Sequence, residues 1–290
     1  MGLACTSGLD TGFVELGYAK VAALGVVQGV TELLPISSTA HMRIVPALLG
    51  WKDPGSAFSA AMQLAALAAV VSYFWKDIRG IAFGSVQAAL RRDFSDWNFR
   101  FLIWIILATI PIGLAGLALS GVLNACGSPL RSLTVIGISC IVMAALLAIA
   151  ELYCNHSRTL DHVSLKDALV VGFAQVGALV PGVSRSGSTL TAALFLDLKR
   201  EQAAQFSFLL GLPAITLAGL KELYELHKAH LDGHGWSVLA VGLVVASISA
   251  FAAIWGLMRF LERFSTWPFV AYRAFIGVVL LVGAATGLLS

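Results

Sequence analysis

Two short polar segments interrupt an otherwise apolar chain, and each contains a proline followed by serines. The first segment offers an amide, a carboxylate, hydroxyls and an imidazole, on Gln28, Glu32, Ser37, Ser38, Thr39 and His41. Gln28 and Glu32 are four residues apart, so they share one face of a helix. Ser38 and His41 are three apart in the helix expected after Pro35, so they are neighbours. These groups can perform general acid–base catalysis or nucleophilic attack.

The second segment runs from Pro181 to Thr189 and has the character of an anion-binding loop. Small residues followed by a helix expose unpaired backbone N–H groups at the positive end of the helix dipole. Arg185 adds a planar guanidinium that suits phosphate oxygens. Further hydroxyl donors are Ser184, Ser186, Ser188 and Thr189. The segment therefore predicts a phosphate site.

Charged groups inside apolar segments favour a meeting of the two polar segments. An ionised side chain costs about 2.5–3.5 kcal/mol at the centre of a membrane helix unless another group compensates it. Glu32 and Arg185 would offset each other when no ligand is bound, an anionic ligand would then take over Arg185, and a divalent cation would sit beside Glu32. Serines after proline are also ordinary helix caps, and Glu32 alone could belong to a structural ion pair. The matching positions of the two segments favour one shared active site.

The composition places the elements that position these residues in a lipid bilayer. The chain has 290 residues, of which 58% are hydrophobic and 12% charged, against about a quarter charged in soluble domains. The net charge of +3 comes without a dense basic stripe, which argues against nucleic acid as a partner. Four cysteines without CxxC spacing argue against a zinc site. The bilayer is the solvent that this composition fits.

Apolar runs predict an all-α polytopic membrane protein with six transmembrane helices and two re-entrant helical hairpins. The six spans are 56–75, 101–123, 133–153, 206–222, 236–258 and 268–289. Two further regions, 13–50 and 168–198, are apolar but broken at the polar segments. Because irregular backbone at membrane depth must be covered by protein or water, each is expected to be a re-entrant hairpin.

The two halves of the chain repeat each other. Residues 25–28 (Gly-Val-Val-Gln) resemble residues 172–175 (Gly-Phe-Ala-Gln), and Phe-Ser opens a span at both 58 and 206. The whole chain, 1–290, is predicted to be one integral membrane domain, with a first repeat over 13–153 and a second over 168–289. Each repeat has one hairpin and three spans, so the second copy is inverted relative to the first.

Basic residues predict the orientation. With the loop 76–100 in the cytoplasm, eleven basic residues of the loops and span ends fall inside and four outside, the four being Lys52, Arg131, Lys221 and Lys228. The first hairpin then enters from outside and the second from the cytoplasm. Arg273, five residues into the last span, is expected to snorkel to the interface, with a place near the site as the alternative. Glycine- and alanine-rich spans serve either a homodimer or packing within the chain.

At these motifs the sequence resembles the undecaprenyl pyrophosphate phosphatase family of bacterial membrane enzymes, also known for bacitracin resistance. The family's acidic motif, (E/Q)xxxE, matches residues 28–32. Its Pro-x-Ser-Ser-Thr-x-His segment matches 35–41, and its Pro-Gly-x-Ser-Arg-Ser-Gly-x-Thr segment matches 181–189. The resemblance covers nearly the whole chain. The family accepts Glu or Gln at position 28, which gives Glu32 the greater weight.

The resemblance implies hydrolysis of a polyprenyl diphosphate to the monophosphate and inorganic phosphate, which recycles the lipid carrier of cell-wall precursors. It implies a divalent cation, Mg²⁺ or Ca²⁺, held by Glu32 and Gln28. It also implies residence in the bacterial cytoplasmic membrane, with a site that opens to the extracytoplasmic side. The expected catalytic residues are Glu32, Ser38, His41 and Arg185, and the expected substrate-binding residues are Ser37, Thr39, Ser184, Ser186 and Thr189.

Several mechanisms stay open on the sequence alone. Ser38 could attack the terminal phosphorus with His41 as its base, or His41 could activate water or attack while Ser38 binds phosphate. A different class of function is also compatible with the pattern. Broken helices that meet at the midplane of inverted repeats are typical of secondary transporters, so a lipid-phosphate or anion transporter using the same site is the alternative.

Overall fold

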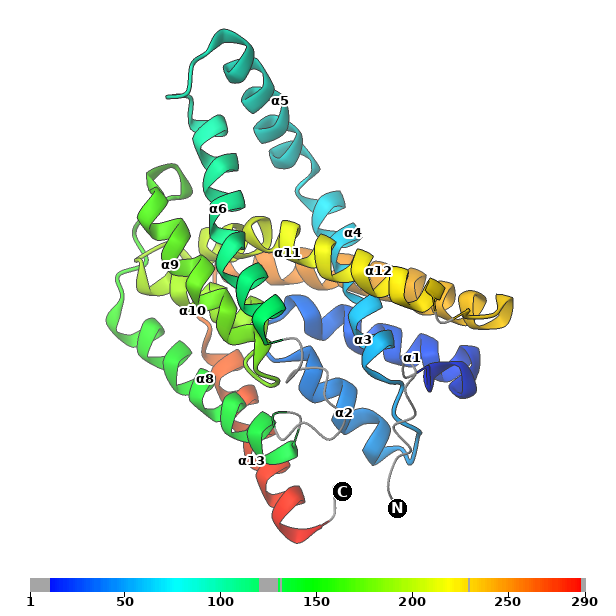
Figure 1. The fold of residues 1–290 in the computed structure, drawn as a ribbon. Helices are drawn as coiled ribbons and strands as arrows, with labels where there is room; N and C mark the ends of the chain where they lie inside the picture. Colours follow the sequence, from blue (N-terminus) through cyan, green and yellow to red (C-terminus); the bar gives the residue numbers. More distant parts are fainter. Residues whose placement is uncertain (1–10, 120–129, 131, 229, 288–290) are drawn as a thin grey trace.

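The computed structural model describes residues 11–119, 130, 132–228 and 230–287, and these are almost entirely helical (Figure 1). Within those ranges the only β-structure is an isolated bridge between Arg158 and Leu198. Six of the described helices are long and apolar enough to cross a membrane: α1 (Phe13–Leu33), α6 (Trp97–Ala118), α8 (Leu133–Tyr153), α11 (Arg200–Lys228), α12 (Gly233–Leu261) and α13 (Trp267–Thr286). Large apolar side chains such as Leu117 and Ile248 are exposed on them, as lipid-facing side chains would be. The predicted class of all-α polytopic membrane protein is confirmed.

Shorter helices complete the chain. They are α2 (Ser38–Leu48), α3 (Ser56–Ala61), α4 (Gln63–Tyr73), α5 (Trp75–Arg91), η2 (Leu160–His162), α9 (Leu165–Val176), η3 (Gly177–Leu179) and α10 (Arg185–Phe195). The predicted span 133–153 has the same bounds as α8, and the spans 206–222 and 236–258 extend at both ends in α11 and α12. Residues 120–123 and 288–289 of two predicted spans, and Arg131 of the charge count, lie outside the described residues.

The predicted span 56–75 differs most from the structure. It is divided into α3 and α4, and the chain then bends by 78° into α5. The predicted loop 76–100 was therefore wrong over 76–91, which is helical. The reason is that α5 is amphipathic, with charged Lys76 and Asp77 in its first turn and buried Ile81 and Ser85 on one face. Its hydropathy is too low for a span, yet its periodicity suits a helix.

The two hairpins are built alike at their tips and differ in length. The first consists of α1 and α2, and the second of α9, η3 and α10. α1 has 21 residues and meets the length and hydropathy criteria of a full span, although it was predicted only as one arm of a re-entrant hairpin. It is kinked at Gly17, where φ is +73°. α9 has only 12 residues.

The first helix of each hairpin packs against a helix from the other half of the chain. α1 packs along α12, where Gly25 and Gly29 lie against the backbone of α12, and the two helices run side by side in Figure 1. In the other half α9 packs along α6, where Gly172 lies against the backbone of Ala108. A Cβ at any of these glycines would approach backbone within 3 Å, so only glycine allows the contact. These small residues thus serve packing within the chain, and the inverted repeat stays a prediction.

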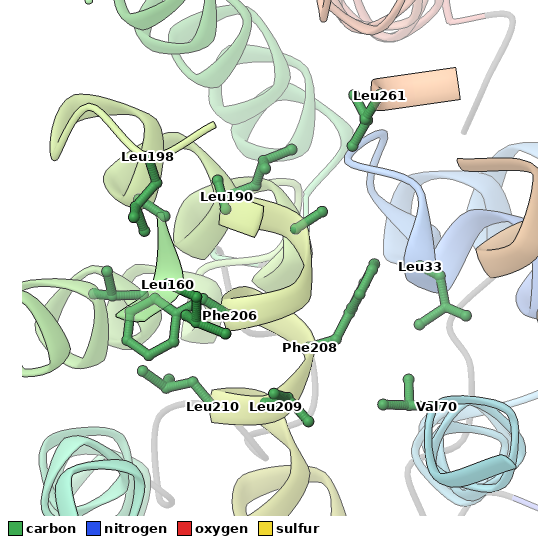
Figure 2. Packing of buried hydrophobic residues seen from close by; sticks show 14 of the residues in the cluster. Leu33, Val70, Leu160, Leu190, Leu198, Phe206, Phe208, Leu209, Leu210 and Leu261 are labelled. Carbon is green, nitrogen blue, oxygen red and sulfur yellow. The ribbon is translucent and has the colours of Figure 1, made fainter. Parts of the chain in front are cut away.

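The main apolar cluster lies directly beside the hairpin tips. Figure 2 shows Leu33, from the end of α1, and Leu190, from α10, gathered with Phe206 and Phe208 of α11. Leu33, Phe206 and Phe208 are almost completely buried. Leu33 directly follows Glu32, so this core fixes the residues that carry the polar groups.

Candidate active site

The two tips begin their second helices in the same way. Ser37 caps α2 with φ +71°, and its hydroxyl accepts from the Ala40 N–H at 3.4 Å. Ser184 caps α10 with φ +69°, and its hydroxyl accepts from the Gly187 N–H at 3.2 Å. These caps make Ser38 and Arg185 the first residue of each helix. The first N–H groups of a helix have no acceptor within it, so both helix ends can receive an anion.

Ser38 and Arg185 both reach Glu32, the carboxylate of the first hairpin. The Ser38 hydroxyl donates to Glu32 Oε2 at 2.6 Å, and Arg185 Nη2 donates to Glu32 Oε1 at 3.4 Å. Gln28 Nε2 also donates to Glu32 Oε2, at 2.9 Å. Glu32 is 6% exposed, so these donors replace the water that a carboxylate would otherwise need. The structure thus brings together four residues that the sequence analysis proposed for the site.

The Arg185 guanidinium is only partly hydrogen-bonded. Its Nη1 is buried and has no hydrogen-bond partner. Gly211 of α11 makes room for it, because a Cβ at that position would lie 2.0 Å from Nη1. A buried, unpaired charged donor is costly, which points to a ligand that completes it. The sequence analysis missed Gly211, whose role depends on how α11 passes the tip.

His41 lies near the same tip but makes different contacts. Its Nδ1 is 2.7 Å from the Ser37 carbonyl oxygen, and its Nε2 is 2.7 Å from the Tyr272 hydroxyl. The expected use of His41 as the base for Ser38 does not match these contacts, since the Ser38 hydroxyl donates to Glu32. Spacing of three residues made Ser38 and His41 neighbours on α2 without making them hydrogen-bond partners.

The remaining predicted binding residues divide into two groups. The Ser186 hydroxyl donates to the backbone oxygens of Glu32 and Leu34, so it joins the two tips. Thr189 is fully buried, and its hydroxyl donates to the Arg185 carbonyl and contacts the Ser207 hydroxyl. Thr39, by contrast, is exposed on α2. Ser186 and Thr189 are therefore engaged in holding the second tip.

Arg273 of α13 contacts both tips, so its predicted snorkelling to the interface is wrong and the alternative, a place near the site, is confirmed. Its side chain is 1% exposed. Nη1 donates to the Pro35 carbonyl at 3.0 Å, and Nη2 donates to the Gly182 and Val183 carbonyls at 2.9 Å each. Three backbone oxygens left over by the irregular tips compensate the buried charge. Its charge inside an apolar span suggested a place near the site, but not which backbone oxygens it contacts.

The residues at Glu32 fit a divalent cation that is shared with a phosphate ligand. Among the described residues, no group of three or more His, Cys, Asp or Glu side chains could hold a metal ion alone. Glu32 supplies one carboxylate and Gln28 one amide. Mg²⁺ is commonly bound by one or two carboxylates together with water and substrate phosphates, so this donor set suits it.

Comparison with known proteins identifies the family of the chain. Residues 21–279 match the model of the family described as bacitracin resistance protein BacA. The chain is 76% identical over 264 residues to Undecaprenyl-diphosphatase 2 of Mesorhizobium japonicum, covering 91% of this chain and all of the relative. It is 51% identical over 276 residues to Undecaprenyl-diphosphatase of Synechococcus elongatus, covering 95% of this chain and 96% of the relative. It is also 50% identical over 275 residues to Undecaprenyl-diphosphatase of Gloeobacter violaceus, covering 95% and 94%. From its match to the family model over most of its length and its identity to these relatives, the chain belongs to the BacA family of bacitracin resistance proteins.

Proposed function

We propose that this protein is a membrane phosphatase that hydrolyses undecaprenyl (polyprenyl) diphosphate to the monophosphate and inorganic phosphate. The observation that carries the proposal is the convergence of Ser38 and Arg185, each the first residue of a helix, on Glu32. One carboxylate thus holds a hydroxyl nucleophile beside an arginine with an unpaired donor. The names of the relatives agree with this substrate, whose monophosphate product would return to carry cell-wall precursors.

The diphosphate is bound by groups of both tips. Arg185 Nη1, which is buried without a partner, takes a phosphate oxygen, and the first N–H groups of α2 and α10 take others. The isoprenoid tail extends among the apolar faces of the spans, where it stays in lipid-like surroundings. The positive-inside distribution supports an orientation with the loop 76–100 in the cytoplasm. The bacterial relatives support a location in the cytoplasmic membrane. The extracytoplasmic opening of the site stays a prediction. A homodimer stays a prediction.

Chemistry begins at Ser38. Glu32 Oε2 accepts the Ser38 proton along their 2.6 Å hydrogen bond while Oγ attacks the terminal phosphorus. A P–O bond forms to Ser38, and the P–O bond to the bridging oxygen breaks. The polyprenyl monophosphate leaves as an anion, held by Arg185.

A second step releases phosphate from Ser38. His41 Nε2 takes a proton from a water molecule that attacks the phosphoserine, and the bond between phosphorus and Ser38 Oγ breaks. The serine oxygen recovers the proton from Glu32, inorganic phosphate departs, and His41 releases its proton to water, which restores the neutral imidazole. Glu32 thus serves the first step and His41 the second, which revises the expectation that His41 is the base for Ser38.

A divalent cation, held by Glu32 and Gln28 on the protein side, would neutralise charge that develops on the transferring phosphoryl group. Treatment of the purified protein with EDTA is expected to abolish phosphate release, and added Mg²⁺ or Ca²⁺ is expected to restore it. Full activity in the presence of EDTA would contradict the requirement for a divalent cation.

The test is trapping of the phosphoenzyme with a lipid diphosphate that carries ³²P in its terminal phosphate. Ser38→Ala is expected to form no labelled protein, and His41→Ala is expected to accumulate it. If both variants release phosphate at the rate of the unchanged protein, the assignment of this active site is wrong. Labelled Ser38→Ala protein would instead show that a residue other than Ser38 is the nucleophile.

The alternative function, a transporter using the same site, makes a different prediction. Detergent micelles have no transmembrane gradient, so a transporter without enzymatic activity would release no phosphate there. The proposed phosphatase should work in detergent. The names of the relatives also favour hydrolysis over transport.

A further inference from the structure

Tyr272 lies on α13, outside both hairpins, yet it makes the one side-chain hydrogen bond that His41 has in the described residues. The Tyr272 hydroxyl is 2.7 Å from His41 Nε2. The two rings are nearly parallel, 6° apart, with their centroids separated by 5.6 Å. None of the roles derived above uses this contact.

The other contact of His41 determines which nitrogen carries the proton. Nδ1 is 2.7 Å from the Ser37 carbonyl oxygen, and a carbonyl oxygen can only accept. Nδ1 therefore holds the hydrogen in the neutral imidazole, and the lone pair lies on Nε2. The Tyr272 hydroxyl donates to that lone pair. The nitrogen that is available for chemistry is thus the one that Tyr272 contacts.

A phenol suits this place because it both donates and accepts. While Nε2 is bare, the hydroxyl donates to it. Because the hydroxyl occupies the only lone pair of Nε2, a proton reaches Nε2 along this hydrogen bond: the hydroxyl passes its hydrogen to Nε2, takes one from the attacking water, and then accepts from the new N–H. Tyr272 is 39% exposed and His41 only 7%, so the hydroxyl lies between the buried imidazole and more open surroundings.

We propose that Tyr272 is a positioning residue for His41, which keeps the Nε2 lone pair oriented and stays bonded to the imidazole when Nε2 takes up a proton. The proposal rests on the proposed function only where it assigns Nε2 to the second step. The contact itself and the position of the proton can be measured without turnover.

The experiment compares Tyr272→Phe with Tyr153→Phe in lipid nanodiscs. Phenylalanine keeps the ring beside His41 and removes only the hydroxyl. Tyr153 is 80% exposed on α8, which makes its substitution a matched control. The ¹⁵N resonances of the histidine side chains are recorded, with His41 assigned by their loss in His41→Asn protein, and steady-state kinetics are measured on the same samples.

In the unchanged protein, Nδ1 is expected to give the protonated signal and Nε2 the unprotonated one. Tyr272→Phe should move the Nε2 signal, leave Nδ1 in place, and lower kcat by roughly 10–100-fold with KM within about twofold. Tyr153→Phe should change neither. An Nε2 signal or a kcat that is unchanged in Tyr272→Phe overturns the proposal, as does a loss that lies in KM alone. If His41→Ala retains full activity while Tyr272→Phe still moves the Nε2 signal, the proposed role of His41 in the reaction is wrong. The hydrogen bond between Tyr272 and His41 is then still supported.

Discussion

Glu32 and Arg185 face each other across the two hairpin tips, with 3.4 Å between Glu32 Oε1 and Arg185 Nη2. Their side chains are 6% and 11% exposed, and 153 residues separate them in the chain. A buried ion pair contributes little net stability, but removal of one partner leaves an uncompensated charge. Variants of Glu32 and Arg185 can therefore distinguish a structural role of the pair from a catalytic one.

Glu32→Gln and Arg185→Gln should each destabilise the protein by about 3 kcal/mol, because each leaves a buried charge alone. The double variant should recover most of the thermal stability in detergent, since two amides can bond each other. It should still release phosphate at least about 1,000-fold more slowly than the unchanged protein. Recovery of activity in the double variant would show that Glu32 and Arg185 form only a structural contact.

Arg185→Lys tests whether the guanidinium acts through its shape as well as its charge. Lysine keeps the positive charge but cannot contact Glu32 and a phosphate with a planar pair of donors. We expect kcat/KM to fall by about 100-fold, which corresponds to about 2.7 kcal/mol. Arg263→Lys, an exposed change at the end of α12, is the control. Equal kcat/KM for Arg185→Lys and unchanged protein would contradict contact through two nitrogens.

Gly211→Ala should disturb the site with little effect on the fold. The added methyl group would lie 2.0 Å from Arg185 Nη1, and the end of a flexible side chain moves more easily than backbone. We expect kcat/KM to fall by roughly 10-fold or more, with the melting temperature changed by only a few degrees. Gly256→Ala is a matched control, because a Cβ there meets nothing within 4 Å. Unchanged kinetics in Gly211→Ala would show that Arg185 does not need this space.

Arg273→Leu should be the most destabilising of these changes. It removes the donors of three tip carbonyls, on Pro35, Gly182 and Val183, and each lost bond to a charged donor costs about 1.5–3 kcal/mol. Thermal unfolding in detergent measures the loss, and Arg263→Leu serves as the exposed control. Arg273→Lys should fall between the two, since an ammonium can reach fewer of the carbonyls. A melting temperature for Arg273→Leu equal to that of the control would show that the hydrogen bonds from Arg273 to the tip carbonyls do not stabilise the fold.

The sequence by itself determined the membrane class, most of the spans and the two polar segments that form the site. Hydropathy and spacing are local properties, and a long apolar run has few alternatives to a helix in lipid. The charges of Glu32 and Arg185 predicted that the tips meet, because each would otherwise stay uncompensated. The same local reasoning missed α5, because its hydropathy is too low for a span and only its amphipathic periodicity marks it as a helix.

Only the tertiary structure decided which groups touch. Ser38 could bond His41 or Glu32 from the same place on α2, and the direction in which α1 ends selects Glu32. The charge of Arg273 suggested a place near the site without naming its partners, and nothing in the sequence pointed to Gly211. Helix packing brings Arg273 to the tip carbonyls and Gly211 to Arg185. Hydrogen bonds depend on distances below about 3.5 Å, and such distances follow from how helices far apart in the sequence pack together.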